Sequence, residues 1–381
     1  MSGAVAGPAL ALLFEAPADA PAGGGAFEPG GDVAGLPLLV RTVLGFQAGG
    51  GGRVILVGAA DEVEPAAALL RAERRVALPV ETAAAAPALE EPAVVMSAGV
   101  CLHRDLAKRL ARAAVSAGRP TRVEELRLEG PEFAVPARTA AERADATHRS
   151  VEALRKPIDG LVSRHLNRHV SLFLTRALMR TGIRPNQVSL VTLSLGVAAG
   201  VLAATGGWLG VALAGVLLQL QSILDGVDGE LARLKYLHSR LGEWLDTLSD
   251  DLSVILFLGG VAVGLWRTTG ATWGLWLGGT AVAALVAQQV LYYTLLITVY
   301  RSGDLLAIPW VANAGRIDVG AARGFAKVVE VLKPLFKHDF NVFLFCLLAL
   351  AYQRGVILAV GAGGALIALV AALLNARRGR G

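Results

Sequence analysis

The sequence predicts a helical membrane domain with six transmembrane helices, preceded by a smaller α/β domain. Of the 381 residues, 54% are hydrophobic and the mean hydropathy is +0.55, which is high for a soluble protein. Apolar runs of membrane-spanning length recur only from about Gln187 onward, whereas the first 150 residues carry scattered charges. The predicted boundaries are 1–148 for an α/β domain, 149–185 for an interfacial amphipathic helix and 186–381 for the membrane domain.

The first domain alternates short apolar runs with helical patterns, which is typical of an α/β fold. Three runs are predicted to be strands: Ala9–Phe14, Arg53–Val57 and Ala93–Met96. Two stretches are predicted to be helices: Pro37–Phe46 and Asp105–Ala117. Stretches rich in Gly and Pro at 20–35 and 49–52 are predicted to be loops.

The segment 149–185 mixes apolar and basic residues at helical spacing, as in His165, Leu166, His169 and Val170. This pattern predicts an amphipathic helix at the membrane surface. Two roles stay open for it, a connector lying on the cytoplasmic leaflet and a part in shaping a substrate site.

Six apolar segments are predicted to span the membrane. They are Gln187–Thr205, Trp208–Leu224, Leu245–Trp266, Thr272–Tyr300, Asn341–Tyr352 and Val356–Leu374. Lys and Arg are concentrated before the first segment, after the second, fourth and sixth, and are nearly absent from the other loops. By the positive-inside rule we expect a multi-pass protein of the inner (cytoplasmic) membrane, with both termini in the cytoplasm.

The net charge of +5 does not indicate nucleic acid, because the basic residues lie beside apolar spans and not on a face that carries aromatic side chains. The partner that they indicate is the lipid bilayer. The two cysteines, Cys101 and Cys346, fall in different domains, which argues against a disulfide or a cysteine metal site.

An acidic motif lies between the second and third predicted spans, at the cytoplasmic face. It contains four aspartates, Asp225, Asp228, Asp246 and Asp250, with glycines at positions 229 and 242. On a helix, residues three or four apart share a face, so two facing helices would direct all four carboxylates to one point. The combined spacing disfavours an ordinary solvated loop.

Four clustered carboxylates repel one another and need cations, for which Mg²⁺ or Mn²⁺, two ions in all, is the natural choice. Two such ions can clamp a pyrophosphate and stabilise a leaving phosphate. Gly229 and Gly242 leave room for a nucleotide, and Arg233 supplies a cation for a phosphate.

The run from Asp225 to Asp250 matches every defined position of D-x2-D-G-x2-A-R-x8-G-x3-D-x3-D. The chain therefore resembles the CDP-alcohol phosphotransferase family from about Arg155 to the C-terminus. The resemblance implies transfer of a phospho-alcohol group from a CDP-alcohol to a hydroxyl acceptor with release of CMP, by a homodimer. It also implies the residue roles, with Asp251 left outside the site. Asp225, Asp228 and Asp246 would be metal ligands, Asp250 the general base and a further metal contact, and Gly229, Ala232, Arg233 and Gly242 would line the CDP site.

Two weaker matches extend the candidate site. The run 185–189 resembles the family's entry to its first span, so Asn186 and Ser189 are candidates for nucleotide binding or, alternatively, polar caps of a helix. Arg323 and Lys337 are candidates for binding a phosphorylated acceptor or, equally, positive-inside anchors.

The stretch 156–171, with DGVDGELAR at 225–233, resembles the branch that includes bifunctional inositol-phosphate cytidylyltransferase and di-myo-inositol-phosphate-phosphate synthase. In that branch a nucleotidyltransferase domain precedes the membrane domain. Here, however, no Arg or Lys occurs before Arg41, and the strand ending at Met96 runs into Ser97-Ala98-Gly99 without the expected Asp. We therefore expect a degenerate nucleotidyltransferase-like domain without cytidylyltransferase activity.

The function predicted for the whole chain is synthesis of an inositol phosphodiester or a phospholipid. The alternatives are a non-catalytic membrane scaffold and an ion-coupled transporter.

Overall fold

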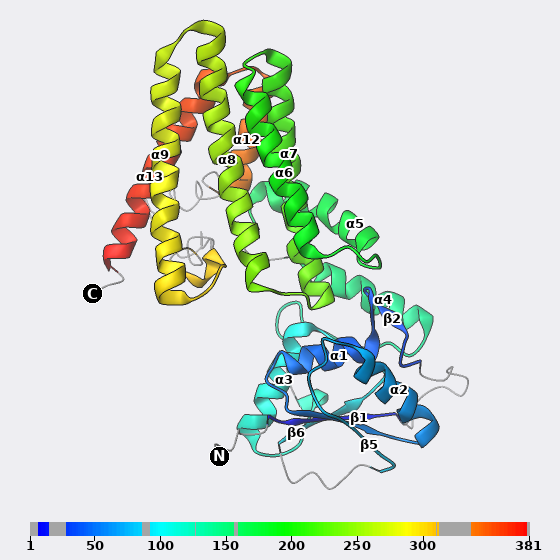
Figure 1. Cartoon of the computed structure of the whole chain (residues 1–381). Helices are drawn as coiled ribbons and strands as arrows, with labels where there is room; N and C mark the ends of the chain where they lie inside the picture. Colours follow the sequence, from blue (N-terminus) through cyan, green and yellow to red (C-terminus); the bar gives the residue numbers. More distant parts are fainter. Residues whose placement is uncertain are drawn as a thin grey trace. The chain divides into compact units, whose positions relative to one another are not determined.

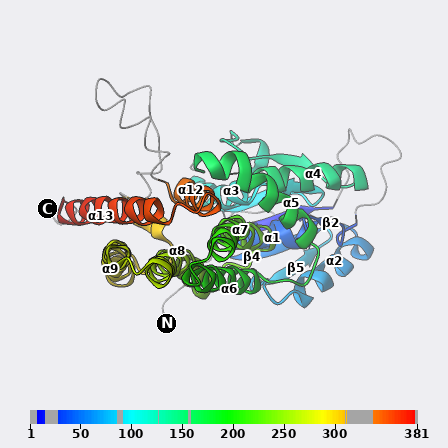
Figure 2. The same cartoon turned by 90° about the horizontal axis from the view of Figure 1, so that it is seen from above.

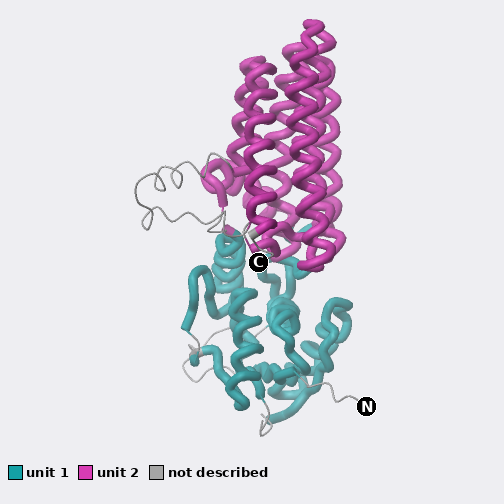
Figure 3. Tube along the Cα trace, turned by 90° about the vertical axis from the view of Figure 1, so that its left-hand side faces the viewer, with its two compact units in different colours: residues 1–154, 179–181, 234–236 teal, residues 155–178, 182–233, 237–381 magenta. Residues whose placement is uncertain are grey.

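A computed structural model gives the fold of the chain (Figure 1). It describes residues 7–14, 28–85, 92–125, 127–155, 159–309, 311 and 337–378. The chain divides into two compact units, shown in different colours in Figure 3. Unit 1 comprises Met1–Leu154, Met179–Thr181 and Leu234–Tyr236, and unit 2 comprises Arg155–Leu178, Gly182–Arg233 and Leu237–Gly381.

Unit 1 contains a five-stranded parallel sheet with strand order β5-β4-β1-β6-β8. Its strands are β1 (Ala9–Leu13), β4 (Arg53–Val57), β5 (Val80–Ala83), β6 (Ala93–Ser97) and β8 (Thr121–Arg122). Two antiparallel pairs accompany it, β2 (Asp32–Val33) with β3 (Leu36–Pro37) and β7 (Val100–Leu102) with β9 (Ala134–Pro136). The three strands expected from the sequence are confirmed to within one residue.

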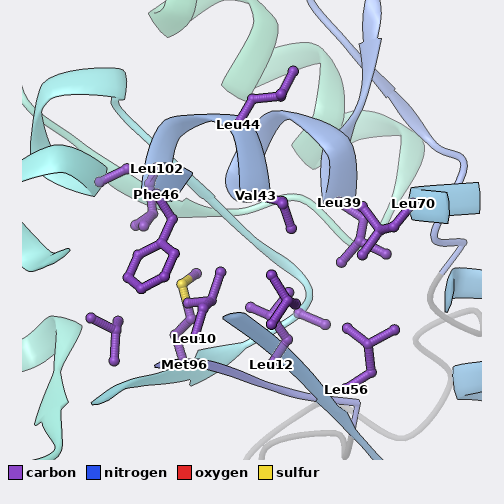
Figure 4. Close-up of a cluster of buried hydrophobic side chains, with 14 of the residues drawn as sticks. Leu10, Leu12, Leu39, Val43, Leu44, Phe46, Leu56, Leu70, Met96 and Leu102 are labelled. Carbon is purple, nitrogen blue, oxygen red and sulfur yellow. The ribbon is translucent and has the colours of Figure 1, made fainter. Parts of the chain in front are cut away.

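Helices supply the crossovers that a parallel sheet requires. Those of unit 1 are α1 (Leu38–Gln47), α2 (Ala60–Ala72), α3 (Arg104–Ala117), α4 (Ala140–Glu152) and the 3₁₀ turn η1 (Val123–Glu125). Leu10 and Leu12 of β1 are buried in one cluster with Leu39 and Phe46 of α1 (Figure 4). Both predicted helices are confirmed, and the α/β sheet fits a nucleotidyltransferase-like domain.

Apart from Leu234 and Lys235, the helices from Arg168 onward belong to the second unit. They are α5 (Arg168–Leu178), α6 (Pro185–Ala204), α7 (Trp208–Lys235), α8 (Arg240–Thr269), α9 (Thr272–Leu295), α12 (His338–Leu350) and α13 (Arg354–Arg378). Shorter turns are η2 (Ser163–Asn167), η3 (Leu296–Tyr300) and η4 (Leu305–Ala307). Within the bundle, α8 lies between α6 and α9. Figure 2 shows these three helices nearly end-on.

Five described helices are long and apolar enough to cross a membrane, and they coincide with five of the six predicted segments. They are α6, α7, α8, α9 with η3, and α13. The chain is therefore a membrane-integral protein. The fifth predicted segment corresponds to α12, whose 13 residues extend over about 20 Å of the roughly 30 Å that a span needs, so a sixth span stays a prediction.

The predicted helix 149–185 is divided in the structure. Helix α4 ends at Glu152, and α5 follows the π-helical turn η2. The second piece is amphipathic, and some of its polar residues are turned inward: Arg168 and Ser171 are buried, whereas Val170 and Phe173 are exposed. Residues 156–158 lie outside the described part of the chain, and a location at the membrane surface stays a prediction.

Glycines allow α6 and α8 to pack at backbone contact. A Cβ atom on Gly260 of α8 would meet the carbonyl oxygen of Gly200 on α6, and one on Gly264 would meet that of Ala203. A Cβ atom on Gly200 would lie 2.8 Å from Cβ of Leu256. Small residues permit such approach between membrane helices. The contact fixes α8 beside α6.

We expect Gly260→Val to lower the melting temperature in detergent by roughly 2–10 °C, because overpacking costs about 1–3 kcal/mol. Gly279→Val is the matched control, since a Cβ atom at Gly279 of α9 meets nothing within 4 Å. Both substitutions put the same β-branched residue into a helix, so equal melting temperatures for the two variants would contradict the packing explanation.

Candidate functional site

The acidic motif lies on helices and not in a loop. Asp225 and Asp228 belong to α7, and Asp246 and Asp250 belong to α8. Only residues 236–239 separate the two helices, which extend beyond the predicted span limits at Leu224 and Leu245. The two facing helices expected from the spacing are thus present. Asp225 and Asp228 lie on the polar continuation of α7 beyond Leu224, which hydropathy misses, whereas Asp246 and Asp250 lie within the third predicted span.

Three of the aspartates meet at one point. Asp225, Asp228 and Asp246 each offer one oxygen, and these oxygens lie within 4.8 Å of one another. The Oδ1 atoms of Asp225 and Asp228 are buried and accept no hydrogen bond. Buried carboxylate oxygens without donors are costly unless a cation binds them. These residues therefore fit a divalent cation with oxygen ligands, such as Mg²⁺ or Mn²⁺.

Neighbouring polar side chains orient two of the four carboxylates. Ser189 Oγ on α6 donates a hydrogen bond to Asp228 Oδ2 at 2.5 Å. Gln221 Nε2 donates to Asp250 Oδ1 at 2.8 Å. The sequence reasoning singled out Ser189 but missed Gln221. A signal for it existed, because Gln221 precedes Asp225 by four residues and so shares its face of α7.

A first cavity of about 280 Å³ lies on one side of the cluster and is lined by Asp228 and Asp246. The structure brings all six residues expected to bind CDP into its wall. They are Asn186, Ser189, Gly229, Ala232, Arg233 and Gly242. A Cβ atom on Gly242 would lie 3.0 Å from Asn186 Oδ1, and one on Gly229 would lie 3.2 Å from Arg233 Nη1. Side chains at either glycine would therefore intrude on the cavity.

A second cavity of about 620 Å³ is lined by the other two aspartates, Asp225 and Asp250. Its wall also includes Lys337, one of the two candidates for acceptor binding. The other candidate, Arg323, lies outside the described residues. The remaining wall comes mainly from the segment 159–171 and from His338 and Asp339 of α12. The four carboxylates thus divide between two cavities of unit 2.

Asp251 lies apart from this cluster. It accepts hydrogen bonds from Gln289 Nε2 at 2.6 Å and from Tyr293 Oη at 2.5 Å, both on α9. Its neighbour Asp250 is bonded instead to α7. Consecutive residues on a helix point about 100° apart, which explains the difference.

The edge of the sheet in unit 1 where a nucleotide would be expected is occupied by an arginine. In parallel sheets of this kind, ligands bind at the carboxyl ends of the strands where the strand order reverses, here between β1 and β6. Arg138 Nη2 donates to Ser97 Oγ there at 2.9 Å, and the Arg138 side chain lies against Gly99. Both cysteines are buried and free.

The fold and the site together define a membrane-integral helical protein with a cluster of carboxylates between two cavities. The sequence profile of the family CDP-alcohol phosphatidyltransferase matches residues 183–374, and the chain belongs to this family. The matched region contains the whole acidic motif, both glycines and Arg233.

Curated relatives share the name "Bifunctional IPC transferase and DIPP synthase". The protein from Thermococcus kodakarensis is 45% identical over 92 residues, 24% of this chain and 20% of the relative. The protein from Aquifex aeolicus is 38% identical over 107 residues, 28% and 24% of the two chains. The protein from Rubrobacter xylanophilus is 34% identical over 183 residues, 46% and 37%. The chain therefore spans between about a fifth and somewhat over a third of the length of these relatives.

We expect Mn²⁺ binding, measured by electron paramagnetic resonance in detergent, to weaken by about tenfold or more in Asp228→Asn, because a ligand charge is lost. Asp251→Asn, a nearby aspartate bonded to α9, serves as the control and should bind like wild type. Equal Mn²⁺ affinity in wild type and Asp228→Asn would contradict the assignment of Asp228 as a ligand.

Proposed function

We propose that the protein transfers a phospho-alcohol group from a CDP-alcohol to a hydroxyl acceptor, with a divalent metal ion and release of CMP. The observation that carries the proposal is the division of four carboxylates between two cavities. One cavity gathers every residue expected to bind CDP, and the other places Asp250 beside an open space. A donor and an acceptor could thus approach the same carboxylates from two sides.

The first cavity suits the CDP part of the donor. Arg233 supplies a fixed cation for a phosphate, and Gly229 and Gly242 leave room for the nucleotide. Asp225, Asp228, Asp246 and Asp250 would hold two Mg²⁺ or Mn²⁺ ions. When bound, these ions supply positive charge that neutralises the pyrophosphate and stabilises the departing CMP.

Asp250 is suited to act as the general base. Its carboxylate takes the proton of the acceptor hydroxyl as the acceptor oxygen bonds to the β-phosphorus of the CDP-alcohol. The bond from that phosphorus to the bridging oxygen breaks, and CMP leaves with the electron pair. The product is a phosphodiester. The hydrogen bond from Gln221 holds the Asp250 carboxylate in one orientation throughout.

The second cavity suits the acceptor, and Lys337 in its wall would attract a phosphorylated one. The donor is a CDP-inositol or a CDP-diacylglycerol, and the product an inositol phosphodiester or a phospholipid. The relatives named DIPP synthase favour the inositol side. We further propose a homodimer in the inner membrane, with the termini and the active site in the cytoplasm, and a unit 1 without cytidylyltransferase activity.

An ion-coupled transporter is the alternative from another class. In a transporter, a buried acidic cluster is expected near the membrane midplane. Asp225 lies ten residues from the end of α7, about 15 Å along a helix about 42 Å long, and Asp250 lies equally far from the start of α8. These positions favour an enzyme site near one end of the bundle. A non-catalytic scaffold is disfavoured because no aspartate of the signature is replaced.

The test is CMP release by purified protein in detergent with Mg²⁺ or Mn²⁺. CDP-inositol and CDP-diacylglycerol are supplied in turn, each with inositol phosphate, inositol or glycerol phosphate. We expect metal-dependent release with at least one pair, and a loss of about 100-fold or more in Asp250→Asn because the general base is removed. Asp251→Asn is the control and should keep wild-type activity.

Undiminished release in Asp250→Asn would contradict the role of Asp250. The absence of release from every pair, together with the absence of metal-dependent CDP binding, would contradict the transferase and favour the scaffold.

A further inference from the structure

Glu230 is a buried carboxylate of α7 that has no part in the proposed reaction. It lies within the acidic motif, and its side chain is fully buried. Its Oε1 atom accepts hydrogen bonds from Arg168 Nη1 at 2.5 Å and Ser171 Oγ at 2.8 Å, and its Oε2 atom accepts one from Thr175 Oγ1 at 2.7 Å. All three donors belong to α5. A charged group on α7 therefore holds the polar face of α5.

Arg168 links Glu230 to a second buried carboxylate. Its Nε and Nη2 atoms donate to the two oxygens of Asp159 at 2.8 and 2.9 Å, while Nη1 donates to Glu230. The side chains of Arg168 and Asp159 are only 9% and 8% exposed. Burial lowers the pKa of Arg168, but the bonds to Asp159 and the charge of Glu230 raise it above its usual value, so the guanidinium stays charged. Lysine has a compact ammonium group and cannot donate to both carboxylates in this planar geometry.

The residues joined by this bridge form one wall of the second cavity. Asp159, Gly160, Ser163 and Arg168 line it together with Asp250. The wall continues into α12, because the backbone N–H of Ser163 donates to Asp339 Oδ2 at 2.7 Å. The Asp339 carboxylate also fills the space that a Cβ atom on Gly160 would occupy. The first cavity contains none of these residues.

The exposure of the segment agrees with this role. Leu166, Val170 and Phe173 are 40%, 38% and 69% exposed, whereas Arg168 and Ser171 are buried. Leu172 of the same helix is also buried, but an apolar contact does not set the direction of the groups that meet. The inward polar face fixes it by oriented hydrogen bonds to α7, which carries two of the four aspartates.

We propose that Arg168, by bridging Asp159 and Glu230, is a positioning residue that sets the acceptor side of the site. It holds the wall formed by residues 159–171 at a fixed distance from Asp250, so that the acceptor hydroxyl meets the carboxylate. This inference rests on the proposed function. Because the bridge touches only the second cavity, its loss should affect the acceptor and spare the nucleotide.

The experiment compares wild type with Arg168→Lys and Glu230→Gln in the CMP-release assay, using CDP-inositol as donor and inositol phosphate as acceptor. Arg168→Lys keeps the positive charge but loses the planar set of guanidinium donors. Glu230→Gln keeps the shape of the side chain but loses its negative charge. We expect the KM for inositol phosphate to rise about tenfold or more in both variants. The KM for CDP-inositol and the Kd for CDP with Mn²⁺ should change less than about twofold. Arg176→Lys, an exposed arginine of the same helix, should match wild type.

A merely structural role would lower CDP affinity and acceptor affinity together, and this result would overturn the proposal, as would an unchanged acceptor KM in both variants. If Arg168→Lys is not monodisperse in detergent, Asp159→Asn takes its place beside Glu230→Gln. A wild-type protein that releases no CMP from this pair but does so from another moves the acceptor assay to that pair. A wild type inactive with every pair counts against the proposed function and removes this inference with it.

Discussion

Repulsion between carboxylates on two neighbouring helices is the constraint on which the rest of the structure depends. Oxygens of Asp225, Asp228 and Asp246 lie within 4.8 Å of one another. At an effective dielectric constant of about 20, two unit charges at that distance repel by about 3 kcal/mol. The helices must therefore be held together by contacts elsewhere, and a divalent cation is the group that would turn the repulsion into attraction.

Two kinds of contact hold α7 and α8, the helices that carry the aspartates, partly through α6. Along the bundle, glycines let α6 and α8 touch at the backbone, with Gly200 against Gly260. Near the site, hydrogen bonds from Ser189 and Gln221 fix individual carboxylates. The first contact depends on shape and would be disrupted by larger side chains. The second is directional and sets where each carboxylate oxygen points. The cavities on either side of the cluster follow from both.

Buried charge serves a different purpose in the bridge of Asp159, Arg168 and Glu230. Replacing a buried ion pair by apolar residues is often neutral for stability, whereas removing one partner costs about 3–5 kcal/mol. Such a bridge therefore adds little net stability while specifying one arrangement of the groups that it joins. Here it joins residues of α5 and of the segment before it to α7, and Asp159 and Arg168 line the same cavity as Asp225 and Asp250.

The sequence by itself determined the features that depend on local periodicity and spacing. These are the strands and helices of the α/β domain, five of the helices long enough to span a membrane, and the acidic motif whose spacing places Asp225 with Asp228 and Asp246 with Asp250. Only the tertiary structure decided that the carboxylates of the motif divide between two cavities, and that Arg168 contacts Glu230. The last pair is 62 residues apart, and their contact depends on how α5 packs against α7, which no local pattern encodes.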